Sequence, residues 1–333
     1  MSTSSHSIEV TADSTPEDES ISLCCPRCRT RIGDLFDQCT TDTQVDCATC
    51  RLTLRCEDGI WKCLLPERVV HFGRFMKDYQ SIRASEGRGS SDSAYYVALP
   101  YRDLSGRNSA QWAIRARTFR YIERHIMPAI IGSSARCLRI LDLGAGNGWM
   151  SYRMALQGHA LVAVDLLTNY QDGLGAAEHF RRRLPTLFPR VQAELDRLPF
   201  VADTFDLVVF NASFHYSEDY AKTLAEALRC TRPGGCVLIA DTAWYSSEQS
   251  GQRMLDERRA AFIQRYGFPS DGLRSLEYLT DERLHDMEKQ FGIQWTVHEP
   301  YYGLRWQMRP LLAKLRSLRE PSRFRIYSAK ANK

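Results

Sequence analysis

Hydrophobic and polar positions along the central part of the chain alternate between two patterns. Short apolar runs predict buried strands, and the segments between them carry apolar residues at the spacing of one helix face. The predicted strands cover residues 138–143, 160–164, 191–195, 205–210 and 237–240. Strands that alternate with helices predict an α/β domain built on a parallel sheet.

The segments on either side of this core carry further helical and strand patterns. A helix is predicted from Ser109, with Pro128 ending it, and another begins at Thr280. Residues 293–298 and 324–330 are predicted strands. Between these strands the sequence predicts a helix with one apolar stripe, made of Met308, Leu311, Leu312, Leu315 and Leu318.

Composition divides the chain into four parts. Residues 1–20 are rich in Ser, Thr and acidic residues and predict a disordered tail. Residues 21–66 are rich in cysteine and form a small module. Residues 67–107 show no clear pattern and are expected to be an irregular connecting segment, and residues 108–333 form the α/β domain.

The cysteine-rich module contains two C-x-x-C pairs. Two such pairs, Cys25 with Cys28 and Cys47 with Cys50, can supply four thiolates to one tetrahedral zinc ion. All four positions would be used, so the zinc would be structural. Chance pairs or redox dithiols are the alternative. Asp58-Gly59 between two apolar segments predicts a hairpin, so the module would be a three-stranded zinc ribbon.

The number of cysteines also bears on the cellular compartment. Eight of the eleven cysteines lie between Cys24 and Cys63, and Cys24 is expected to be a bystander beside Cys25. Residues 1–20 lack the basic and apolar parts of a signal peptide, so a reducing cytoplasm is expected. That compartment favours a metal site over disulfides.

A glycine-rich turn follows the first strand of the α/β domain. Gly144, Gly146 and Gly148 allow a sharp bend and a close approach of backbone to ligand at a helix N-terminus. Their spacing, with Asp142 inside the strand end, differs from the G-x-G-x-x-G of dinucleotide sites. The acid suits a cofactor that carries a positive amino group. An ordinary tight strand–helix turn is the alternative.

Residues 142–148 resemble the first motif of class I S-adenosylmethionine (SAM) methyltransferases. Asp165 follows the second strand at the distance expected for a ribose ligand, and residues 196–200, 205–210 and 232–235 also resemble motifs of the family. The resemblance spans residues 105–333 and implies a Rossmann-like sheet of seven strands. The expected SAM-binding residues are Asp142, Gly144, Ala145, Gly146, Asn147, Gly148, Asp165, Leu166, Glu194, Leu195 and Asn211.

The resemblance places the segment after the fourth strand next to the transferred methyl group. It implies His215 as a general base and Tyr216 as a residue that orients the acceptor. The alternative for His215 is a helix-start residue bonded to backbone. The order of the zinc module and the α/β domain is also similar to the order in bacterial ribosomal RNA guanine-N1 methyltransferases. From this resemblance we expect the same fold and cofactor, but not the same methyl acceptor.

Net charge and hydropathy leave three functions open. The formal net charge is only +4, so composition alone implies no polyanion partner. No apolar run is long enough to span a membrane, so no membrane partner is expected, and no obligate protein partner is evident. Residues 303–333 carry nine Lys or Arg and a single acid, Glu320. The basic residues could form a face that contacts phosphate. The protein would methylate a small metabolite, or alternatively RNA. The least favoured function is a SAM-binding scaffold without catalysis.

Overall fold

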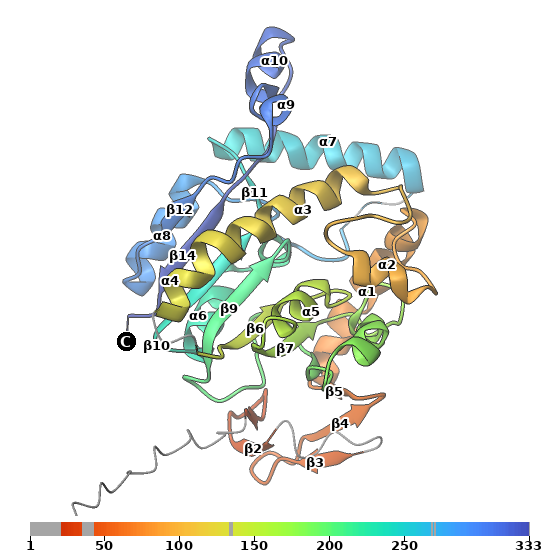
Figure 1. Ribbon diagram of the computed structural model, residues 1–333, viewed down its shortest axis with the longest axis vertical. Helices are drawn as coiled ribbons and strands as arrows, with labels where there is room; N and C mark the ends of the chain where they lie inside the picture. Colours follow the sequence, from red (N-terminus) through yellow and green to blue (C-terminus); the bar gives the residue numbers. More distant parts are fainter. Residues whose placement is uncertain (1–20, 35–42, 133–135, 268, 270, 333) are drawn as a thin grey trace, which may run out of the picture.

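The computed structural model describes residues 21–34, 43–132, 136–267, 269 and 271–332 (Figure 1). The predicted tail at residues 1–20 lies outside this part of the chain. The centre is a mixed sheet whose seven-stranded part has the order β12-β14-β10-β9-β6-β7-β8. Its strands are β6 (Arg139–Leu143), β7 (Ala160–Asp165), β8 (Arg190–Gln192), β9 (Phe205–Asn211), β10 (Thr231–Ala240), β12 (Thr296–His298) and β14 (Ile326–Lys330).

The strand order reverses between β6 and β9. The chain runs from β6 outward to β7 and β8, then returns to place β9 on the other side of β6, with all of these pairs parallel. β14 pairs antiparallel with β10 and with β12. This confirms the expected Rossmann-like sheet of seven strands. In such sheets ligands bind beyond the carboxyl ends of the strands that flank the reversal.

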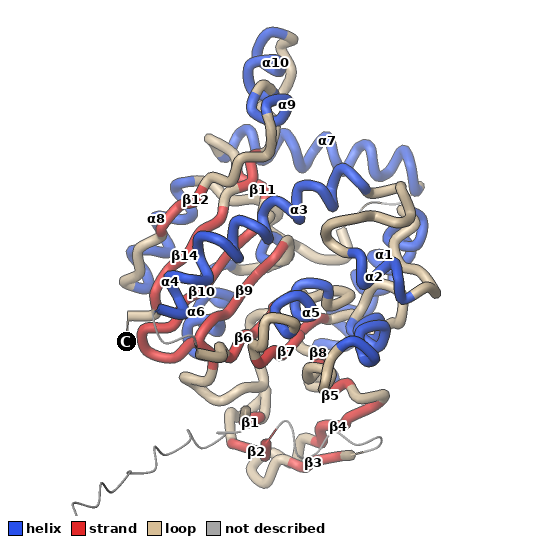
Figure 2. Tube along the Cα trace, viewed as in Figure 1, coloured by secondary structure: helices blue, strands red, loops and turns tan. Residues whose placement is uncertain are grey.

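Alternate residues of each central strand face two separate cores. Ile140, Leu207 and Val209 belong to one cluster, with α3 (Ser109–Tyr121), α5 (Trp149–Ala155) and the 3-10 helix η3 (Leu174–Arg183). Leu141, Val208 and Phe210 belong to the other cluster, with α6 (Tyr220–Cys230) and α8 (Asp281–Phe291). The side-chain period of two in a strand therefore produces three layers, with helices on both faces of the sheet (Figure 2).

The cysteine-rich module extends the sheet instead of standing apart from it. Its strand β5 pairs in parallel with β8, with Trp61 opposite Val191, so the sheet grows to ten strands. Asp58 and Gly59 both have positive φ and close the predicted hairpin between β4 and β5. The strands of the module are β1 (Ser22–Cys24), β2 (Arg31–Asp34), β3 (Gln44–Asp46), β4 (Thr53–Glu57) and β5 (Ile60–Lys62).

The expectation of an irregular segment at residues 67–107 is wrong. It contains two helices, α1 (Pro66–Ser85) and the short α2 (Ser93–Ala98). Pro66 occupies the first turn of α1, where its missing N–H costs nothing. The helical pattern is weak because Phe72 alone is buried while Val70 is 82% exposed. Much of the helix instead faces a cavity or forms ion pairs.

Pro128 does not end the helix that begins at Ser109. The chain continues from α3 through a π-helical turn (Ile122–Ile126) into α4 (Met127–Ile131), and Pro128 sits in the first turn of α4. The wider π turn brings the proline to a position that needs no backbone donor. Buried Ile122 and Ile126 hold this turn against the sheet.

The remaining elements lie beside the carboxyl ends of the strands. They are the two-residue strands β11 (Ala243–Trp244) and β13 (Arg323–Phe324), α7 (Glu248–Tyr266), α9 (Leu304–Gln307) and α10 (Arg309–Leu315). Figure 1 shows α9 and α10 projecting beyond the body of the protein. No helix among the described residues is both long and apolar enough to cross a membrane.

Candidate active site

The glycine turn after β6 is shaped by close contacts that exclude side chains. Gly144 has φ +72°, and a Cβ added there would lie 2.2 Å from the Cβ of Ser213. Gly148, at φ +76°, is the N-cap of α5, where a Cβ would lie 3.1 Å from the Phe188 ring. A side chain would therefore be strained at both positions, and at Gly144 it would also collide with Ser213. It lies at the reversal between β6 and β9.

Asp165, at the end of β7, is tied to this turn. One carboxylate oxygen accepts from the backbone N–H of Gly146 and the other from that of Leu167, each at 2.8 Å. These bonds fix the orientation of the carboxylate. Burial nevertheless raises its pKa to about 6. An oriented carboxylate at the end of the second strand is suited to accept from ribose hydroxyls.

Asp142 and Asn211 come from the two strands that flank the reversal. Asp142 accepts from the Ser151 hydroxyl at 2.7 Å, and burial raises its pKa to about 7. The Asn211 amide donates to the Asp241 carboxylate at 3.2 Å. One cavity at the strand ends is lined by most of the expected cofactor residues. They are Asp142, Gly144, Ala145, Gly146, Asn147, Asp165, Leu166, Leu195 and Asn211.

Two expected cofactor residues do not line this cavity. Gly148 caps α5 behind the turn. Glu194 is 3% exposed, and its carboxylate pairs with Arg68 of α1 at 2.6 Å. Burial raises the pKa of Glu194 to about 7, with neighbouring Asp196 adding to the rise. Its closest cationic partner, Arg68, thus lies on α1, a helix that the sequence pattern did not predict.

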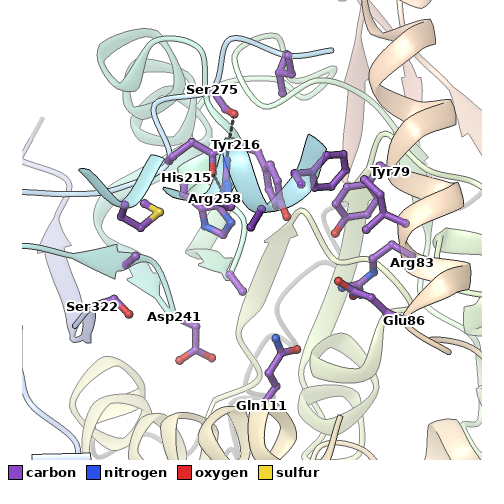
Figure 3. Close-up of a pocket in the computed structure, with 18 of the residues that line it drawn as sticks. Tyr79, Arg83, Glu86, Gln111, His215, Tyr216, Asp241, Arg258, Ser275 and Ser322 are labelled. Carbon is purple, nitrogen blue, oxygen red and sulfur yellow. Dashed lines mark hydrogen bonds and ion pairs between the residues drawn. The ribbon is translucent and has the colours of Figure 1, made fainter. Parts of the chain in front are cut away.

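A second cavity, of about 660 Å³, adjoins the first. Six residues line both cavities: Phe75, Tyr79, Arg83, Arg115, Ala212 and Tyr216. The larger cavity continues between α1, α3 and α7, with Met254, Arg258 and Phe262 contributed by α7. Figure 3 shows its lining, with Tyr79 and Arg83 of α1 reaching toward the segment that carries Tyr216. Two ligands bound in these cavities would meet at this shared wall.

The candidate catalytic residues both line the larger cavity. His215 Nδ1 is buried and has no hydrogen-bond partner among the described residues. Burial lowers the pKa of His215 to about 4, so its imidazole is neutral at pH 7. Tyr216 also borders the first cavity, and its ring packs edge-to-face on Tyr79 with centroids 5.7 Å apart. The backbone N–H of Glu277, which has φ +69°, donates to the His215 carbonyl at 2.9 Å.

Arg115 on α3 belongs to both cavities, although the sequence analysis did not select it. It forms no ion pair or hydrogen bond within the part of the chain that is described, and its guanidinium lies 4.9 Å from the centre of the Trp112 ring. Burial lowers its pKa, the nearby guanidinium groups of Arg83 and Arg88 lower it further, and the charge of the Asp241 carboxylate partly opposes them. Arg83 itself is paired with Asp172. Arg115 is therefore a cation positioned to receive an anionic group from a ligand.

The four cysteines of the two C-x-x-C pairs converge in the N-terminal module. Their sulfur atoms all lie within 4.8 Å of one another, and this is the one such cluster that the described residues contain. Cys25 and Cys50 are 3.4 Å apart, as are Cys28 and Cys47. The Thr30 hydroxyl, 3.3 Å from the Cys28 sulfur, lowers the pKa of that thiol to about 6. Cys24 points elsewhere and donates to the Phe200 carbonyl.

The fold fits a Rossmann-like class I methyltransferase domain. Residues 141–239 match a family described as a methyltransferase domain. This match covers the glycine turn, Asp165 and the segment that carries His215 and Tyr216.

Curated relatives share this segment of the chain. The demethylmenaquinone methyltransferase of Beutenbergia cavernae is 30% identical over 169 residues, which cover 48% of this chain and 64% of the relative. The malonyl-[acyl-carrier protein] O-methyltransferase of Halorhodospira halophila is 38% identical over 110 residues, 31% of this chain and 34% of that protein. The chain thus spans less than two thirds of the length of these relatives.

Solved structures of methyltransferases are also similar. The phosphoethanolamine N-methyltransferase 2 of Haemonchus contortus, in complex with SAM, has a TM-score of 0.46 and 17% identity, covering 62% of this chain and 51% of that one. A SAM-dependent methyltransferase from Thermotoga maritima has a TM-score of 0.44 and 13% identity, covering 79% of this chain and 98% of that one.

Proposed function

We propose that the protein is a SAM-dependent methyltransferase that methylates a small organic acceptor held in the 660 Å³ cavity. The observation that carries this proposal is the shared wall between the two cavities, which includes Arg115, Ala212 and Tyr216. A cofactor in one cavity and an acceptor in the other would be in contact at this wall. A volume of this size falls within the range of small-molecule sites.

The charged groups and the glycine turn of the first cavity support SAM as its ligand. The glycine turn leaves room for close backbone approach, and Asp165 would accept from the ribose hydroxyls. Asp142 lies in the same cavity and suits a positive amino group, while Arg115 suits a carboxylate. An amino-acid moiety carries both of these charged groups. SAM supplies a methyl group that is already activated as a sulfonium.

The contribution of the protein to methyl transfer is alignment and exclusion of water. Phe75, Tyr79 and Tyr216 form an aromatic boundary between the cavities, and this boundary would hold the acceptor atom in line with the methyl group. His215 is neutral, so its unpartnered Nδ1 can accept a hydrogen bond from an acceptor hydroxyl or amine. Tyr216 would orient the acceptor from the opposite side of the same segment.

The class of acceptor is drawn from the cavity and from the relatives. The cavity is lined by aromatic rings, among them Tyr245, Phe262 and Tyr266, together with guanidinium groups. The relatives named above act on demethylmenaquinone and on malonyl-[acyl-carrier protein], as their names state. Both names favour a small or carrier-linked organic acceptor over a polynucleotide.

We further propose that Cys25, Cys28, Cys47 and Cys50 bind a structural zinc ion. Tetrahedral zinc with sulfur at about 2.3 Å needs sulfur–sulfur distances of about 3.8 Å. The measured separations, from 3.4 Å to at most 4.8 Å, bracket this value. Four protein ligands would leave no open position for chemistry, so the role is to hold the module together.

Incubation with methyl-labelled SAM and fractionated cell extract tests the proposal. Label should enter a small-molecule fraction, and the Asp165→Ala variant should transfer much less. Label in RNA would favour the alternative RNA methyltransferase, for which counterion release would make binding to bulk RNA fall steeply with salt. No label in any fraction, despite SAM binding, would favour a non-catalytic scaffold.

A further inference from the structure

The short helices α9 and α10 present an apolar surface that the body of the protein does not cover. Leu304 is 69% exposed, Leu311 51%, Leu315 73% and Leu318 62%. None of them joins a buried core cluster. We call residues 304–318 the hairpin. Its exposed apolar side chains are Leu304, Met308, Leu311, Leu312, Leu315 and Leu318.

The charge of the hairpin has a single sign. Residues 303–319 contain Arg305, Arg309, Lys314, Arg316 and Arg319 and no acidic residue. Arg305, Lys314 and Arg316 are exposed and form no ion pair with the described residues. Arg319, at the base, pairs with Glu257. The hairpin therefore combines exposed leucine with unneutralised positive charge.

The base of the hairpin is anchored and its end projects. Trp306 stacks on Phe324 with centroids 5.5 Å apart, and the Arg309 guanidinium lies 3.8 Å from the centre of the Trp306 ring. Figures 1 and 2 show α10 extending past α7 into free space. The apolar side chains thus sit on a protrusion held by its first turn, not in a groove.

We infer that the hairpin docks the protein on an anionic lipid bilayer. Leucine side chains beside Lys and Arg are the composition of segments that lie in the membrane interface. The hairpin has basic residues but no acidic ones, and anionic headgroups would supply the opposite charge. A second copy fits less well, because two hairpins would bring like charges together. Docking in the interface differs from spanning, so it is compatible with the absence of a spanning helix among the described residues.

The position of the hairpin relates it to the larger cavity. Arg319, Ser322 and Phe324, which follow the hairpin, line that cavity. A bilayer bound by the hairpin would therefore lie next to the side of the protein where these residues border the cavity. Docking depends only on the surface of the hairpin, so it does not require the proposed methyl transfer.

Vesicle flotation with the zinc-loaded protein of residues 1–333 tests this inference. Vesicles of equimolar phosphatidylcholine and phosphatidylglycerol should carry the protein upward at low salt, and vesicles of phosphatidylcholine alone should carry much less. The triple variant L311S/L315S/L318S should lose about tenfold or more of the bound fraction, because it removes three of the apolar side chains that would enter the membrane interface. The double variant K314Q/R316Q should lose the preference for anionic vesicles.

Val70→Ser on α1 is the matched control, because Val70 is exposed apolar surface away from the hairpin. It should bind vesicles like the unmodified protein, and all variants should keep their melting temperature. Absence of binding to anionic vesicles at low salt would overturn the inference, as would equal binding by the triple variant. A dimer in solution that the triple variant converts to monomer would show instead that the surface is a self-interface.

Discussion

The backbone N–H of Gly146 donates to the carboxylate of Asp165 at 2.8 Å. This bond joins the turn after β6 to the end of β7, two segments that are adjacent in the sheet. It makes the shape of the glycine turn and the orientation of the acid depend on each other. The first cavity, which both residues line, is thus preorganised by a bond within the protein.

Gly144→Ala should destabilise the protein more than the matched variant Gly158→Ala. Both glycines have positive φ, so both variants suffer the strain of about 1–2 kcal/mol that this conformation imposes on alanine. At Gly144 the added Cβ would also collide with Ser213, whereas Gly158 has nothing within 4 Å. The collision should add about 1–3 kcal/mol to the loss of unfolding free energy. Urea denaturation measures both variants, and equal losses would contradict the crowding argument.

Arg115→Gln should weaken the binding of S-adenosylhomocysteine by about tenfold or more, because a charged hydrogen bond contributes about 1.5–3 kcal/mol. The expectation rests on Arg115 receiving the carboxylate of the amino-acid moiety. Binding of 5′-methylthioadenosine, which lacks that moiety, should change little. Calorimetry with both ligands separates the effects. Arg124→Gln, an exposed arginine on the π-helical turn, is the control. An equal loss for both ligands would show that Arg115 does not act on the carboxylate.

His215 should titrate near pH 4 and not near its usual pKa of about 6.5. Because its pKa is lower in the folded than in the unfolded protein, the unfolded chain binds more protons between about pH 4 and pH 6.5. His215 therefore makes stability rise with pH across this window and fall as the pH drops through it. His215→Gln should flatten that part of the pH–stability curve. NMR titration of the imidazole checks the pKa, and a midpoint at pH 6.5 would rule out a desolvated ring.

Removal of zinc, or Cys47→Ser, should lower the melting temperature of the whole protein in a single transition. The reason is that β5 is hydrogen-bonded to β8 and that Trp61 belongs to the same core as Val191. Loss of the module would leave this edge of the sheet unpaired. Cys137→Ser, an exposed cysteine outside the cluster, is the control. Two separate melting transitions, with the second unchanged when a chelator removes zinc, would show that the module folds independently.

The sequence predicted the parts of the site that are local in the chain. The glycine turn, the acid at the end of β7 and the four cysteines are each contained in short segments with characteristic spacing. The capping residue Thr280 also marked a helix start correctly.

The parts that depend on tertiary proximity were not predictable in this way. Arg115 has an ordinary place on an amphipathic helix, and only packing brings it beside the glycine turn. The pairing of β5 with β8 joins residues far apart in the chain. Helix α1 was not predicted because its aromatic residues Phe75 and Tyr79 line a cavity and do not belong to an apolar face packed on a core. The signal that could have revealed it was Pro66, followed by Phe72, Phe75 and Tyr79 at helical spacing.

Calorimetric titration of the zinc-loaded protein of residues 1–333 with S-adenosylhomocysteine tests the central claim most directly. We expect one site per chain, with affinity reduced about tenfold or more in Asp165→Ala through loss of a hydrogen-bonded charge. Asp286→Ala, an exposed acid on α8, should bind like the unmodified protein. No heat with this ligand, or binding of NAD in its place, would contradict the assignment of the cavity to SAM.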